Sequence, residues 1–143
     1  MMNNFLTDQQ MASLVEAIQT AEDHSTGEIR IHIDSNTEGN NAEIAFEVFR
    51  RLCKDQTVEK NAVLFHVNFE QKYLTIIGDE GIHAKVNQTF WDQMHDQITT
   101  QFSKGNFHDG LKNAVLETGL ELKKYFPIKG VNPNELSNEI TFS

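Results

Sequence analysis

Alternating and apolar runs of residues predict three strands along the chain. Residues 28–34, EIRIHID, alternate at every position, so the isoleucines share one face and the polar side chains share the other. Two later runs, 62–69 and 73–78, are rich in valine, isoleucine and aromatic residues and are separated by the polar residues 70–72. This arrangement is typical of an antiparallel hairpin.

Four other segments carry apolar residues every three or four positions, as on the buried face of an amphipathic helix. A capping-box sequence begins the first of them at Thr7, with Gln10 three residues on. The last of them ends before Pro127, where a helix commonly stops. The predicted helices cover residues 8–24, 42–54, 82–102 and 111–126.

The element order is therefore α-β-α-β-β-α-α. A strand–helix–strand unit implies a right-handed crossover between the first two strands, which are then parallel. The hairpin adds the third strand antiparallel to the second. We therefore predict an α/β fold, a three-layer α/β/α sandwich around a small mixed sheet. Residues 1–143 are expected to form a single domain on which a tail, 128–143, packs through Leu136, Ile140 and Phe142.

Composition and charge narrow the choice of partners. The chain has 143 residues, 38% of them hydrophobic, which suits a soluble globular domain. A formal net charge of −9 argues against nucleic acid and anionic membranes as partners, because both attract clustered lysine and arginine. The sequence has neither a membrane span nor a signal-peptide pattern, so we expect a cytoplasmic location. The single cysteine, Cys53, is expected to be a small buried hydrophobe.

Strand direction brings four oxygen-bearing residues to one edge of the predicted sheet. The first and second strands begin with Glu28 and near Asn61, and the third strand runs back to Asp79 and Glu80 between two glycines. Glycine allows backbone angles that other residues resist, so the two glycines are expected to hold both acids in a tight turn. Carboxylate and amide oxygens are the ligands that calcium and magnesium prefer. The sequence therefore predicts a divalent-cation site here. The alternative is that Asp79 and Glu80 only cap the helix that follows.

A second acidic patch lies in the loop after the first strand, near the opposite edge of the sheet. It has the acidic residues Asp34, Glu38 and Glu43 among the asparagines at 36, 40 and 41. The spacing lacks the regular ligand alternation of an EF-hand, so a solvated loop is the preferred interpretation. A second metal site is the alternative.

The six histidines show no paired spacing of the kind that binds zinc. His32 and His66 can meet across neighbouring strands, where two structural histidines are favoured over a catalytic pair. The sequence also lacks the motifs of nucleophilic hydrolases and of phosphate-binding loops.

Several short motifs, in matching order, resemble the TPM domain, the family of a thylakoid-lumen protein and its bacterial relatives. The resemblance covers almost the whole chain and is nearest to soluble members from cold-adapted marine bacteria. The matching motifs are TGEIR at 26–30, NAVL at 61–64, IGDEGI at 77–82, FW at 90–91, the glycine and phenylalanine pattern of 102–111, FP at 126–127 and NPNELSNEI at 132–140.

The resemblance implies an α/β/α sandwich with a divalent-metal site, usually calcium, whose acidic motif falls on Asp79 and Glu80 with Glu28 and Asn61 beside it. It also implies the acid-phosphatase activity claimed for the plant member. Two functions therefore stay open. The first is calcium binding, with magnesium as an alternative cation, in a recognition or assembly role. The second is metal-assisted hydrolysis of phosphomonoesters, for which the sequence offers no lysine or arginine cluster at this edge.

Overall fold

A computed structural model of the chain describes residues 6–128 and 138–143. Within these residues it contains five helices and four strands. The helices are α1 (Asp8–Glu22), α2 (Asn41–Leu52), α3 (Glu80–His83), α4 (Gln88–Ser103) and α5 (Phe107–Tyr125), and the strands are β1 (Glu28–Asp34), β2 (Ala62–Asn68), β3 (Tyr73–Gly78) and β4 (Thr141–Phe142).

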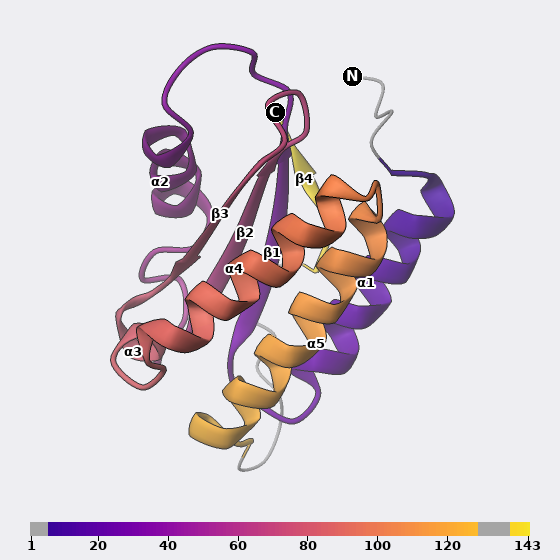
Figure 1. Cartoon of the computed structure of the whole chain (residues 1–143). Helices are drawn as coiled ribbons and strands as arrows, with labels where there is room; N and C mark the ends of the chain where they lie inside the picture. The colour runs from indigo at the N-terminus through magenta and orange to yellow at the C-terminus, as the bar shows by residue number, and fades with distance from the viewer. Residues whose placement is uncertain (1–5, 129–137) are drawn as a thin grey trace.

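The strands form one mixed sheet in the order β3-β2-β1-β4 (Figure 1). β1 and β2 are parallel, and β3 returns antiparallel to β2. The predicted parallel pair and hairpin are therefore confirmed, and β1 and β3 have the predicted bounds. In this sheet β3 is one edge strand and β4 is the other.

Helices cover both faces of the sheet, which confirms the α/β/α sandwich (Figure 1). α1, α4 and α5 lie on one face, over a core that contains the three isoleucines of β1 and Phe65 of β2. α2 lies on the other face, over a smaller core around Leu64. Cys53 belongs to this smaller core, as predicted, and burial raises its pKa to about 12, so its thiol stays protonated and unreactive.

A close approach between α1 and α5 tightens the three-helix layer. A Cβ atom on Gly119 would lie 2.6 Å from the Cβ of Ala21. Only a residue without a side chain therefore fits at position 119. The two helices pack at backbone distance, which draws their apolar faces down together on the sheet.

The prediction of one long helix over 82–102 is wrong. The chain forms a single short turn of helix, α3, and then starts again at α4. Asn87 has extended backbone angles and caps α4, because its side chain accepts a hydrogen bond from the Phe90 amide at 3.1 Å. Ile82 and Val86 are both buried in the same core, so the apolar spacing continues across the break and hid it in the sequence.

The described end of the predicted tail adds a strand that the sequence did not indicate. β4 pairs parallel to β1, with Thr141 opposite His32 and Phe142 opposite Ile33. Ile140 packs against the larger core, as predicted, whereas the side chain of Phe142 is 39% exposed. Leu136 lies outside the described residues.

Among the helices that the structure describes, none is long and apolar enough to span a membrane.

Replacing Ile31 or Phe65 by alanine should lower the free energy of unfolding by about 2–5 kcal/mol, because both side chains are fully buried and each change leaves a cavity. Urea denaturation measures the effect. Leu120→Ala, on an exposed position of α5, is the matched control and should change stability by less than about 0.5 kcal/mol. Equal losses in the buried and exposed variants would contradict the assigned strand faces.

Candidate functional site

The four residues predicted from strand direction lie at one edge of the sheet. Glu28 begins β1 and pairs with Ala62, directly after Asn61, while Val63 pairs with Gly78 at the end of β3. The edge is therefore formed by the starts of β1 and β2 and the end of β3, as predicted. We call it the amino edge, after the ends of the two parallel strands.

Asp79 acts as a helix cap at the amino edge. Its buried carboxylate accepts hydrogen bonds from the Glu80 amide at 2.8 Å and the Asp55 amide at 3.0 Å. The first bond caps α3, and the second fixes the loop that leads into β2. The capping alternative raised by the sequence therefore holds for Asp79. A carboxylate has about four lone-pair positions, so these two bonds leave acceptor capacity.

The glycines on either side of Asp79 and Glu80 do not adopt backbone angles that require glycine. They make room for neighbouring atoms instead. Neither Gly78 nor Gly81 has a positive φ angle, although the sequence analysis assigned them that role. A Cβ atom on Gly81 would lie 2.0 Å from the carbonyl oxygen of Glu59. The Gly81 amide instead donates to the Lys60 carbonyl at 2.7 Å, so the turn is tied directly to the backbone before β2.

Glu80 points toward solvent and takes part in a surface ion pair. The Lys60 ammonium lies 3.6 Å from the carboxylate of Glu80 and 3.6 Å from that of Asp55. All three side chains are about half exposed or more, so these contacts contribute little to stability. They do place one positive charge at the amino edge.

Glu28 forms a buried pair of carboxyl groups with Glu22 at the end of α1. Both side chains are buried, and the Glu22 carboxylate accepts a hydrogen bond from the Ile29 amide at 2.7 Å. Burial, and after it the charge and hydrogen bond of the neighbouring Glu28 carboxylate, raise the pKa of Glu22 to about 9. A proton is therefore held between the two acids at neutral pH.

Asn61 is fully buried, and of its two polar side-chain atoms only Nδ2 makes a hydrogen bond to the described residues. Its Nδ2 donates to the Thr26 hydroxyl at 3.0 Å, and that hydroxyl donates in turn to the Glu59 carboxylate. Its Oδ1 atom is shielded from water and has no hydrogen-bond partner among the described residues. A buried amide oxygen without a donor is costly, and a cation or a bound water at this position would remove that cost.

The four predicted residues share the amino edge but do not form one compact group of ligands. In the described parts of the chain, no three His, Cys, Asp or Glu side chains are close enough together to hold a metal ion. Sequence reasoning missed Glu22, Thr26 and Glu59. Glu22 carried a usable signal, since it lies four residues after the buried Ile18 and so falls on the core face of α1.

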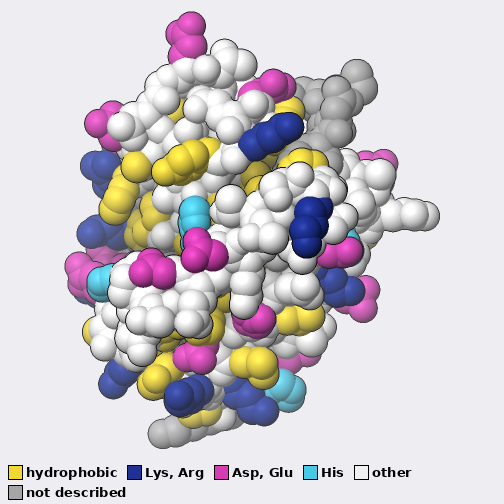
Figure 2. Space-filling model, in the orientation of Figure 1, with side chains coloured by type: hydrophobic (Ala, Val, Ile, Leu, Met, Phe, Trp, Pro, Cys, Tyr) yellow, Lys and Arg dark blue, Asp and Glu magenta, His cyan; other side chains and the backbone are white. Residues whose placement is uncertain are grey.

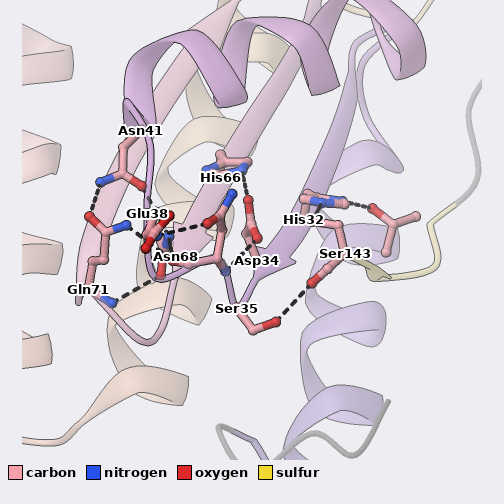
Figure 3. A network of polar contacts seen from close by, with 11 residues as sticks. His32, Asp34, Ser35, Glu38, Asn41, His66, Asn68, Gln71 and Ser143 are labelled. Carbon is pink, nitrogen blue, oxygen red and sulfur yellow. Dashed lines mark hydrogen bonds and ion pairs between the residues drawn. The ribbon is translucent and has the colours of Figure 1, made fainter.

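At the opposite edge, polar side chains tie the loop after β1 to the hairpin (Figure 3). The Asp34 carboxylate accepts from the Asn36 amide at 2.9 Å. Asn68 donates to the Asn36 carbonyl at 2.7 Å and to the Asn41 side chain at 3.1 Å. Residues 36–40 are exposed, and Asn40 caps α2. Residues 36–40 of the acidic loop are therefore solvated and organised by asparagines, whereas Asp34 is buried at the end of β1.

His32 and His66 do meet across the sheet. Their rings stack with centroids 5.5 Å apart, and both side chains are buried. His32 bonds through both ring nitrogens to hydroxyls of the last strand segment, at 2.7 Å to Thr141 and 2.8 Å to Ser143 (Figure 3). Burial lowers the pKa of His32 to about 4 and lowers that of His66 too. Asp34 lies 3.5 Å from His66, which partly opposes the effect of burial. Both rings are neutral at pH 7, and His32 anchors β4.

The polar face of β1 is mostly buried. Glu28, His32 and Asp34 are buried, and Arg30 is half-buried. The polar residues of the strand are therefore structural parts of the two edges.

The Glu22–Glu28 pair predicts a pH-dependent stability in metal-free protein. The ordinary pKa of 4.5 rises to about 9 in the folded state, so folded protein keeps a proton that the unfolded chain loses. The free energy of unfolding should therefore fall as pH rises from 6.5 to 9, whereas below 6.5 the lowered pKa values of His32 and His66 contribute an opposing rise. Urea denaturation in EDTA measures this. Glu22→Gln should flatten the fall, whereas Glu16→Gln, exposed on the same helix, should keep it. A slope that survives Glu22→Gln would contradict the assignment.

One family model and two solved structures resemble this chain. The chain matches the TPM domain over residues 2–120. The solution structure of the BA42 protein from the psychrophilic bacterium Bizionia argentinensis is similar at a TM-score of 0.91, with 38% identity, covering 100% of this chain and 99% of that one. The N-terminal domain of a protein from P. gingivalis shares the fold alone, at a TM-score of 0.70 and 17% identity over 89% of this chain and 84% of that one. A search of curated proteins finds no match.

The family match covers most of the chain, and BA42 comes from a cold-adapted bacterium, as the sequence resemblance predicted. The chain belongs to the TPM domain family.

Proposed function

We propose that this TPM domain binds a divalent cation, calcium in preference to magnesium, at the amino edge. Glu28, Asn61, Asp79 and Glu80 would supply the ligands. The observation that carries the proposal is the fully buried Asn61 side chain, whose Oδ1 finds no hydrogen-bond partner within residues 6–128 and 138–143. It is a hard oxygen of the kind that calcium takes, held rigidly at the start of β2.

The neighbouring groups fit a calcium ion better than a magnesium ion. The available donors are carboxylate, amide and hydroxyl oxygens from several separate loops. Calcium accepts six to eight such oxygens in irregular geometry, whereas magnesium demands a near-ideal octahedron. Thr26, whose hydroxyl meets both Asn61 and Glu59, could supply a further oxygen.

The role that best suits such a site is recognition or assembly. A cation held among loop residues orders the turns at the end of β3 and before β2, which would shape this edge for a partner. Membership of the TPM domain family does not by itself establish which reaction the protein catalyses. We therefore place this calcium-binding role first.

Calorimetric titration with calcium should give a saturable isotherm, and Glu28→Gln should weaken it by about tenfold, since calcium affinity follows the number of charged ligands. Asp79→Asn should weaken it too, and is preferred to alanine because asparagine can still cap α3. At calcium concentrations of about 100 times Kd, binding should stabilise the fold by roughly 2.7 kcal/mol over protein in EDTA.

Two controls make this test decisive. Asp96→Asn, on α4 away from the edge, should leave the isotherm unchanged. Glu38→Gln tests the acidic loop at the opposite edge. A loss of binding in Glu38→Gln alone would move the site there, and identical melting curves in calcium and EDTA would refute cation binding.

Metal-assisted phosphatase activity is the second candidate. Two observations favour it: Lys60 places a cation at the amino edge, and Arg30, two residues into β1, has a buried Nε atom with no partner among the residues that the structure describes. Hydrolysis of a phosphomonoester also needs an activated water or nucleophile. The proposed calcium ion is a poorer activator of water than zinc, and the histidines have no paired spacing that would bind zinc.

Turnover of an aryl phosphate from about pH 4 to 9, with calcium, magnesium or zinc, should therefore be weak or absent. Robust turnover that disappears in both Glu28→Gln and Asp79→Asn would reverse the order of the two candidates. Turnover unaffected by either variant would point to a contaminating enzyme.

A further inference from the structure

The edge strand β3 has main-chain groups that no other strand satisfies. The Asp79 amide donates to the Ala62 carbonyl at 2.9 Å, which fixes the phase of the antiparallel ladder. Ladder bonds alternate along such a pair, so residues 73, 75 and 77 bond to β2, whereas 74, 76 and 78 direct their amide and carbonyl groups outward. The Leu74 carbonyl confirms this phase, because it accepts from the ring of His95 at 2.9 Å.

Ile76 and Gly78 therefore carry the open part of this edge. Among the described residues, none bonds to the outward amide and carbonyl groups of these two positions. His95 closes the edge at its Leu74 end, and α3 follows Asp79 at the other. The open edge is thus short, with two donors and two acceptors.

A groove lies over this open edge. It is a cavity of about 390 Å³ between α2 and α4, open to solvent. Phe46 and Phe49 line it from α2, Trp91 lines it from α4, and Ile76 and Gly78 lie along β3. Figure 2 shows hydrophobic side chains gathered on the left of the view, where α2 and α4 flank β3. Phe46 is 54% exposed and adds apolar surface to this groove.

Charged side chains of both signs border the groove, and Asp79 and Glu80 line it at its α3 end. On the α2 side, Lys54 lines the groove directly after the helix. On the α4 side, Gln88 lines the groove and donates to the Asp92 carboxylate at 2.9 Å. Asp92 lies four residues after Gln88 and three before His95, so it falls on the helix face that borders β3. An added strand would send alternate side chains toward these two walls.

We propose that β3 is a docking site for a short extended segment of a partner protein, which pairs antiparallel with Ile76 and Gly78. Residues of this segment that face α4 are basic, opposite Asp92, and those that face α2 are acidic or apolar, opposite Lys54 and Phe46. Gly78 leaves the edge backbone bare beside Trp91, because a Cβ at this position would lie 2.9 Å from Ile82 and 3.8 Å from Trp91. Main-chain hydrogen bonds provide the affinity. The alternating charge determines which residues of the segment lie opposite Ile76 and Gly78.

A second copy of the chain fits this edge less well. α2 and α4 flank β3 on its two faces, so two copies approaching edge to edge would bring four helices together before their strands could pair. A single extended segment is narrow enough to lie between the helices.

The probe is the capped peptide Lys-Glu-Lys-Val-Lys-Glu, titrated into ¹⁵N-labelled protein in EDTA and followed by NMR. We expect saturable shifts that are largest at the Ile76 and Gly78 amides. In an antiparallel pair, directly opposite residues share a face, so the lysines would bond to β3. N-methylation of the lysine amides should abolish binding, whereas N-methylation of the glutamate and valine amides should not.

Charge variants of the protein test the register. Asp92→Lys and Lys54→Glu should each weaken the peptide by roughly twofold to fivefold, as expected for one exposed charge pair, while Lys112→Glu on α5 should not. Absence of shifts at Ile76 and Gly78 in the millimolar range, or equal binding of the two methylated peptides, would overturn the proposal. Shifts at the same amides on raising protein concentration without peptide would assign the edge to a second copy instead.

Discussion

The parallel pairing of β1 with β2 is the constraint on which the rest of the fold depends. Two parallel strands cannot be joined by a tight turn, so α2 must cross over one face of the sheet. That crossover leaves the other face for α1, α4 and α5, which bury the isoleucines of β1. The same pairing puts the starts of both strands together, and so determines which polar side chains share the amino edge. Fold and candidate site therefore have one physical origin.

The sequence predicted the parts of the structure in which local pattern and tertiary burial agree. β1 alternates strictly and was delimited correctly, because one of its faces lies in the large core. The break between α3 and α4 was missed because Ile82 and Val86 keep helical spacing while the cap at Asn87 interrupts the backbone. β4 was missed because a strand of two residues in a polar segment has no periodicity to detect.

The candidate site was predictable only as far as strand direction determines it. Direction placed Glu28, Asn61, Asp79 and Glu80 at one edge, but it could not say that Asp79 would be engaged by the amides of Glu80 and Asp55. Nor could it reveal the proton shared by Glu22 and Glu28, since α1 reaches β1 only through tertiary packing. The sequence also suggested that the glycines beside Asp79 and Glu80 supply unusual backbone angles. In the structure, Gly81 instead makes room for the backbone before β2.

The position of β4 has a consequence for the order in which the chain folds. His32 and Thr141 are 109 residues apart, so pairing them directly would close a very long loop at a high entropic cost. A bridge between Ser25 and Pro127 brings the end of α5 beside the start of β1 and shortens that loop to the residues after 127. β4 should therefore join the sheet after α5 has docked on α1. It should also be the first strand to detach, leaving the three-stranded core intact.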